Sequence, residues 1–217
     1  MVGLMLKDLL TMRRYLKSLL GVCVLLGAMG FILKSPSYVS GVGGVTSFLV
    51  CMVSFSYDEN AKWDAYGLTL PVTRKTCVQA KYLLSLAMVL LGAVVSALIA
   101  GGIMAYWETI DWMELLSLVG STMVTGIVII SLMIPCIYKL GVERSRLAIM
   151  VVFLVPMGVF LWYLGSGLAL PPLAPWMGKL LPALLDSLYW FPHALLLLLL
   201  LWGSYLVSRR IYEKKEF

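Results

Sequence analysis

Six apolar runs, each long enough to cross a lipid bilayer, alternate with short polar segments along this chain. They cover roughly residues 18–34, 39–56, 82–106, 115–138, 147–168 and 189–208, and apart from Lys34 at the end of the first run they contain no Asp, Glu, Lys or Arg. A helix of about 20 apolar residues spans the hydrocarbon core of a membrane. The pattern predicts an all-α integral membrane protein, with residues 1–217 forming a single transmembrane domain of six transmembrane helices.

The basic residues predict how these helices are oriented. All but two of the 17 Lys and Arg residues lie before the first run, in the segments 57–81 and 139–146, or after the sixth run. Only Lys34 and Lys179 fall in the alternate segments. Because loops rich in Lys and Arg stay on the cytoplasmic side, we expect a multi-pass membrane protein with both termini cytoplasmic.

Composition agrees with a membrane protein and argues against a nucleic-acid binder. The chain is 61% hydrophobic with a mean hydropathy of +0.96, whereas soluble domains are about 45–50% apolar. The net charge of +6 is spread over four short segments next to the predicted helices. That distribution is typical of contact with anionic lipid and not of a basic nucleic-acid surface. We therefore expect membrane lipid, and no nucleic acid, among the partners.

Groups able to carry catalysis or hold a cofactor are scarce. The single histidine, His193, lies near the outer end of the sixth run, and the four cysteines form no CxxC pair. Glu108, Asp111 and Glu114 share one short loop, where their spacing favours a solvated turn over an acid–base pair. The chain has no G-x-x-x-x-G-K phosphate loop. We expect no enzyme activity and no catalytic, cofactor or metal site in this chain, so any ATP hydrolysis belongs to a separate subunit.

Residues 1–17 are predicted to form an amphipathic helix that lies along the inner membrane surface before the first span. Apolar and polar residues fall on opposite faces of this helix and its continuation: Met5, Leu9, Met12, Leu16 and Leu20 against Lys7, Thr11, Arg14 and Ser18. A helix with two such faces lies in the interface and does not cross the bilayer. The alternative is a plain basic flank to the first span.

The segment 170–192, between the fifth and sixth runs, is apolar but contains five prolines. If it crossed the membrane as a further helix, the basic C-terminus would lie outside, against the positive-inside bias. We expect a re-entrant hairpin of two short helices in the outer leaflet, with protein covering their backbone ends.

The inner segment 57–81 mixes charged residues with large aromatic and aliphatic ones. Pro71 favours an extended conformation at Leu70, and Thr73 is suited to cap a new helix. We expect a compact helix, a break over residues 67–71, and a new helix that enters the third span. The most informative run is Asp58-Glu59, Lys62-Trp63-Asp64, Tyr66, Leu68-Thr69-Leu70-Pro71-Val72-Thr73-Arg74, Val78 and Ala80-Lys81-Tyr82.

This run resembles the inner loop between the second and third spans of ABC-2 type transporter permeases, in the short six-span form of bacterial exporters. The layout of an interfacial N-terminal helix, six spans and an outer re-entrant segment resembles that family as well. The resemblance implies a subunit of the bacterial plasma membrane that dimerises with a second copy or a paralogue. It also implies a separate ABC ATPase subunit, which binds ATP and Mg²⁺ and into which the 57–81 loop docks as a coupling helix.

Six residues of the loop are the candidate ATPase-coupling residues. Four supply apolar anchors and two supply charges at the rim, a composition typical of protein interfaces: Trp63, Tyr66, Leu68 and Leu70, with Asp64 and Arg74. The alternative is that the aromatic residues anchor the loop at the lipid interface.

The absence of charge in the predicted spans favours hydrophobic or amphipathic cargo. The chain is similar to short permeases that export amphipathic peptides of the phenol-soluble modulin type or give immunity to antimicrobial peptides, so we expect peptide export. A lipid or a hydrophobic drug is the alternative cargo. The alternative function is a non-transporting scaffold or sensor subunit that recruits an ATPase, and cargo-stimulated ATP hydrolysis distinguishes the two.

Overall fold

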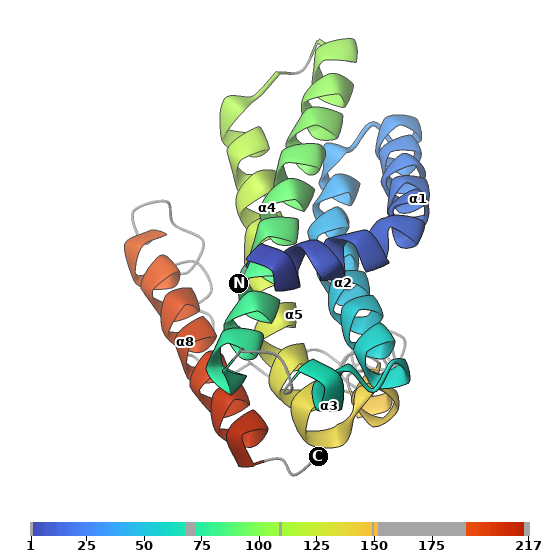
Figure 1. Ribbon diagram of the computed structural model, residues 1–217. Helices are drawn as coiled ribbons and strands as arrows, with labels where there is room; N and C mark the ends of the chain where they lie inside the picture. The colour runs from blue at the N-terminus through green and yellow to red at the C-terminus, as the bar shows by residue number, and fades with distance from the viewer. Residues whose placement is uncertain (1, 68–72, 109, 149, 152–189, 215–217) are drawn as a thin grey trace, which may run out of the picture.

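The structure, a computed structural model, describes residues 2–67, 73–108, 110–148, 150–151 and 190–214, and this part of the chain is helical, with turns and no strand (Figure 1). Its elements are α1 (Val2–Ile32), the 3-10 helix η1 (Pro36–Ser40), α2 (Gly41–Asn60), α3 (Trp63–Gly67), α4 (Arg74–Tyr106), α5 (Trp112–Leu140) and α8 (Trp190–Lys214). Residues 142–148 are helical as well. The predicted all-α class is confirmed for these residues.

The long helices agree with the predicted spans. Four segments are long and apolar enough to cross a membrane, Pro36–Asn60, Arg74–Tyr106, Trp112–Leu140 and Leu195–Lys214, and the two parts of α1 together make a fifth, bent candidate. Most of the predicted span 147–168 and most of the segment 170–192 lie outside the described residues. The count of six spans and the outer re-entrant hairpin therefore stay predictions.

Helix α1 has two parts that meet at the predicted boundary between the N-terminal helix and the first span. Gly3–Arg13 and Lys17–Ile32 are bent by 67° relative to each other, and Figure 1 shows the first part crossing in front of α4 and α2 before the chain turns. Within the first part, Asp8 and Met12 are buried and Leu9 is exposed, and the placement of this helix along the membrane surface stays a prediction. Asp8 lies inside because lysine side chains neutralise it there.

Small residues allow α2, α4 and α5 to approach closely. Gly92, Ser96 and Ala100, spaced four residues apart on α4, are buried, and a methyl group at Gly92 would lie 3.6 Å from Thr46 Oγ1 of α2. Gly126 of α5 is tighter still, since a methyl group there would lie 2.8 Å from a Val89 methyl. Close helix contact through small residues is the common packing mode in membranes.

Pro135 lies inside α5 without ending the helix. Proline has no amide hydrogen, so the carbonyl of Ser131, four residues earlier, has no donor within the helix. Ser204 of α8 supplies one, because its Oγ donates to Ser131 O at 2.7 Å. The Tyr82 hydroxyl of α4 lies 2.6 Å from Ser204 Oγ and 2.8 Å from Ser208 Oγ. A chain of hydroxyl groups thus joins α4, α5 and α8 at the proline.

Candidate coupling site

The predicted coupling loop contains a short helix between two long ones, as the sequence indicates. α2 ends at Asn60 and α3 covers Trp63–Gly67. Lys62 between them has a φ of 49°, a left-handed conformation that turns the chain sharply. The next helix, α4, begins at Arg74, and Thr73 caps it by accepting a hydrogen bond from Thr76 N at 3.3 Å. The predicted cap at Thr73 is confirmed.

The two aromatic residues of α3 differ in exposure. Tyr66 is 59% exposed. Trp63 is half-buried, and Lys7 Nζ lies 4.0 Å from the centroid of its ring. The two rings are 5.4 Å apart. Of these two predicted anchors, Tyr66 is therefore the more exposed, and Trp63 packs α3 against Lys7 of the N-terminal helix.

Of the other four candidate residues, the structure describes the side chain of Arg74. Leu68, Leu70 and the side chain of Asp64 lie outside the described part of the structure, so their coupling role stays a prediction. Arg74 is placed: its Nη1 donates to the carbonyls of Tyr212 and Glu213 at 3.1 and 2.9 Å. These carbonyls belong to the last turn of α8, where a cation is favourable because carbonyl groups there have no helical partner. Arg74 thus fastens the start of α4 to the end of α8.

Next to α3, two lysines and two aspartates form a closed ring of ion pairs, which we call the charge ring: Lys7, Asp58, Lys81 and Asp8. Lys7 Nζ contacts Asp58 at 2.6 Å and Asp8 at 2.8 Å. Lys81 Nζ contacts Asp58 at 2.5 Å and Asp8 at 2.8 Å, through the second oxygen of each carboxylate. Opposite charges alternate around the ring, so its net charge is zero.

The charge ring is largely shielded from solvent. Asp8 is 4% exposed and Lys81 is 8% exposed, and Lys81 Nζ also donates to Ser54 Oγ at 2.5 Å. Burial alone would lower the pKa of Lys7, but the hydrogen bonds and charges of Asp58 and Asp8 outweigh it and raise that pKa above its usual value. Removing one member of a buried ion pair costs about 3–5 kcal/mol. The ring therefore requires all four residues.

A cavity of about 110 Å³ lies beside the ring and α3. Its walls include Trp63 and all four members of the charge ring, together with Cys77, Tyr138 and Tyr212. Glu59, also in the wall, accepts a hydrogen bond from Val142 N at 3.0 Å. A carboxylate at the start of a helix stabilises its free amide groups. Glu59 thereby connects the segment 57–81 to residues 139–146.

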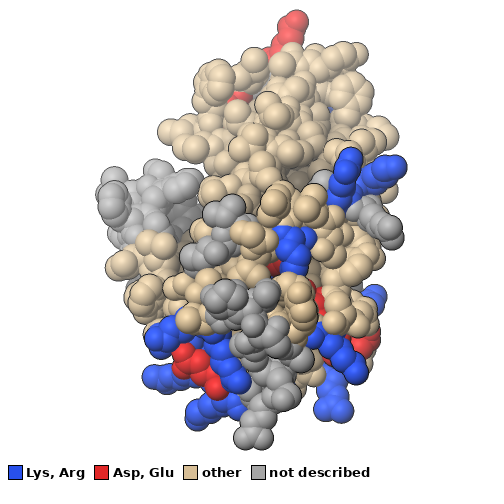
Figure 2. All heavy atoms as spheres, viewed as in Figure 1, with Lys and Arg blue, Asp and Glu red and all other residues tan. Residues whose placement is uncertain are grey.

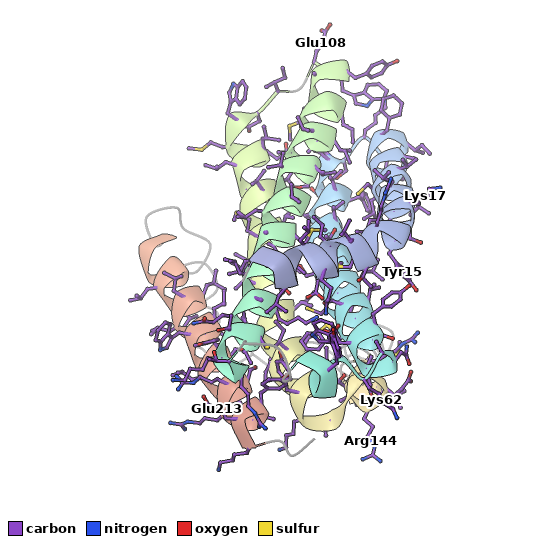
Figure 3. The ribbon with its side chains drawn as sticks, in the orientation of Figure 1. Tyr15, Lys17, Lys62, Glu108, Arg144 and Glu213 are labelled. Atoms are coloured by element: carbon purple, nitrogen blue, oxygen red, sulfur yellow. The ribbon has the colours of Figure 1, made fainter. Side chains whose placement is uncertain are left out.

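The polar connections gather at one end of the molecule. Figure 3 shows Lys62 and Arg144 at the same end and Glu108 at the opposite one. In the view of Figure 2, most of the Lys and Arg side chains lie in the lower half with acidic side chains among them, and the upper tip is acidic. Asp111, three residues after Glu108, caps α5 by accepting a hydrogen bond from Met113 N at 2.8 Å. Among the described residues, no group of His, Cys, Asp or Glu has the geometry to hold a metal ion.

The charge ring is not evident from the sequence pattern. The pattern predicts Lys81 in a loop, whereas Lys81 lies in the second turn of α4 because that helix begins at Arg74. The same pattern predicts Lys7 on a polar face and indicates no role for Asp8. The available signal was the presence of both signs of charge at the inner ends of α1, α2 and α4. The pairing itself depends on the bend in α1, which brings residue 8 to residue 81.

These features define a multi-pass membrane protein whose helices enclose a polar, charge-balanced site at one end of the bundle. The model of the family described as ABC-2 family transporter protein matches residues 3–213. The chain belongs to this family, and it is accordingly a membrane transport subunit that partners with an ABC ATPase subunit. Comparison with curated proteins and with solved structures gives no match.

Proposed function

We propose that this chain is the permease subunit of an ATP-driven exporter, and that its 57–81 segment transmits the motion of the ATPase through α3. The observation that carries the proposal is the position of α3, a short helix that presents an exposed Tyr66 at the end of the molecule where Lys62 and Arg144 lie. Tyr66 is an exposed aromatic residue on a helix that Trp63 packs against Lys7, and such residues are typical anchors of protein interfaces.

The proposal includes the finer points of topology and assembly. The chain spans the bacterial plasma membrane six times with both termini cytoplasmic, and residues 170–192 form the outer re-entrant hairpin. Two copies, or one copy and a paralogue, make the permease. ATP and Mg²⁺ bind to the partner ATPase and not to this chain. The distribution of Lys and Arg along the sequence supports this orientation.

The proposed cargo is hydrophobic or amphipathic, with amphipathic peptides as the first candidate and lipids or hydrophobic drugs as the second. The predicted spans 39–56, 82–106 and 115–138 contain no Asp, Glu, Lys or Arg, and Asp58 and Lys81, which lie just beyond two of them, neutralise each other. A path between such helices offers a charged cargo no fixed counter-charge at membrane depth. Amphipathic cargo avoids that cost because its charged side stays near the interface.

ATP hydrolysis by the permease co-purified with its ATPase subunit in lipid nanodiscs tests this function. We expect an amphipathic helical peptide to stimulate hydrolysis. Tyr66→Ala should weaken ATPase binding by about 2 kcal/mol, roughly 30-fold. Tyr38→Ala, at an exposed tyrosine of η1, is the matched control and should bind as the wild type does.

Three outcomes separate the readings. Stimulation that Tyr66→Ala abolishes supports an exporter coupled through α3. Stable ATPase binding without a response to peptide, lipid or drug supports the scaffold or sensor function. Equal binding by Tyr66→Ala and the wild type would remove α3 from the interface.

A further inference from the structure

The charge ring joins three separate elements at one point. Lys7 and Asp8 come from the first part of α1, Asp58 from the last turn of α2, and Lys81 from the second turn of α4. α2 and α4 are the two helices that hold α3 between them in the chain. The ring therefore connects the N-terminal helix to both supports of the proposed coupling helix.

Lys7 also contacts α3 directly. Its Nζ lies 4.0 Å from the centroid of the Trp63 ring while it bonds to Asp58 at 2.6 Å. A cation over an indole face is attracted by the ring electrons, most strongly where water is excluded. A displacement of Trp63 therefore acts on Lys7, and through Lys7 on the backbone of the N-terminal helix.

The ring favours concerted movement of these elements. If one element moved alone, at least one buried charge would lose its partner, which is costly in a shielded site. If the elements move together, all four contacts are kept. The adjacent cavity of about 110 Å³, which Trp63 lines, leaves space for α3 to shift without displacing packed side chains.

We propose that the charge ring is a mechanical link that makes the N-terminal helix, residues 3–13, move together with α3 when the ATPase subunit binds ATP. This inference rests on the proposed function, because it takes α3 as the element that the ATPase moves. The exposed side chains of the N-terminal helix, Leu6, Leu9 and Leu10, move with it. ATP binding by the ATPase subunit thereby moves residues 3–13, which the sequence predicts to lie in the membrane interface.

Hydrogen exchange of the permease–ATPase complex in nanodiscs tests the link, with the nucleotide-free state compared with a trapped ATP state. In the wild type, we expect protection to change in residues 63–67 and in residues 3–13. The apolar variant Lys7→Met/Asp8→Leu/Asp58→Leu/Lys81→Met keeps side-chain bulk without buried charge, a replacement that often preserves folding. In this variant, residues 63–67 should respond as before, and the response of residues 3–13 should be lost.

A smaller change keeps the test decisive if the fourfold variant does not fold. Lys7→Met/Asp8→Leu removes one charge of each sign, the two that the N-terminal helix contributes, and leaves Lys81 Nζ paired with Asp58 at 2.5 Å; it should also abolish the response of residues 3–13. Lys34→Met is the matched control, because Lys34 lies 4.4 Å over the Trp107 ring at the other end of the bundle. It should respond like the wild type.

Each result decides one point. A persistent response of residues 3–13 in the variants that lack ring charges overturns the link, and so does a wild type in which only residues 63–67 respond. Those results leave the proposed function intact. A wild type in which residues 63–67 do not respond to ATP overturns both the link and the coupling role of α3.

Discussion

At the scale of single residues, Gly126 sets the closest approach between helices. A methyl group at this position would lie 2.8 Å from Ser47 Oγ and 2.8 and 2.9 Å from the two Val89 methyls. Gly126→Ala should therefore force α2 and α4 away from α5 and destabilise the protein by about 1–3 kcal/mol. The thermal unfolding midpoint of the purified protein in nanodiscs measures this effect.

Gly203→Ala is the control for that substitution. Gly203 also lies inside a helix, α8, but a methyl group there meets no atom within 4 Å. Its replacement should leave the unfolding midpoint unchanged or raise it slightly, since Gly is a weaker helix former than Ala by about 1 kcal/mol. Equal midpoints for the two variants would show that the approach at Gly126 is not tight.

The sequence predicts local contacts of single residues well and contacts between distant residues poorly. The cap at Thr73 and the short helix after Lys62 could be predicted because a capping hydroxyl and a helix break act through neighbouring residues. The ion pair of Asp8 with Lys81 could not be predicted, because the two residues are 73 positions apart in the sequence and meet only through the packing of α1 against α4. The sequence pattern predicts Arg74 as a charged residue at a protein interface. Its hydrogen bonds to the last carbonyls of α8 depend on distant packing in the same way, so the sequence did not predict them.

At the scale of elements, Pro135 and α8 depend on each other. Ser204 Oγ donates to the carbonyl of Ser131, which the proline leaves without a helical donor. We expect Ser204→Ala to destabilise the protein by about 1 kcal/mol. In a Pro135→Ala background the amide of residue 135 can bond to that carbonyl, so the same substitution should cost less by at least about 0.5 kcal/mol.

A double-mutant cycle of unfolding free energies measures this coupling. Wild type, Ser204→Ala, Pro135→Ala and the double variant are compared by denaturant or thermal unfolding in the same lipid. Ser121→Ala is a suitable control, since its hydroxyl donates to Leu118 O within α5 itself and should show no coupling to Pro135. Additive costs of Ser204→Ala and Pro135→Ala would contradict the dependence.

Element positions were largely predictable because apolar run length governs them. α4 and α5 contain the predicted spans 82–106 and 115–138, and α2 and α8 cover most of the spans 39–56 and 189–208. The helix ends differed more, since α4 begins at Arg74 and α8 extends to Lys214. Hydropathy marks where a helix enters lipid and not where it ends, so polar turns beyond the membrane were counted as loop. This error is what placed Lys81 outside its helix.

At the scale of the whole molecule, the two ends of the bundle differ in chemistry. One end brings together α3, the charge ring and the bond between Glu59 and Val142. The opposite end carries the exposed Glu108 and the Lys34–Trp107 contact. Since basic loops are retained in the cytoplasm, the end with Lys62 and Arg144 should face inward.

This orientation predicts the accessibility of single cysteines in intact cells. Glu108 and Arg144 are exposed and lie at opposite ends of the molecule. A membrane-impermeant maleimide should label Glu108→Cys from outside, and Arg144→Cys only after the membrane is opened. The wild type is the control, since its cysteines Cys23, Cys51, Cys77 and Cys136 are buried or half-buried. The reverse labelling pattern would invert the orientation and place α3 outside the cell, where ATP-driven coupling through it has no partner.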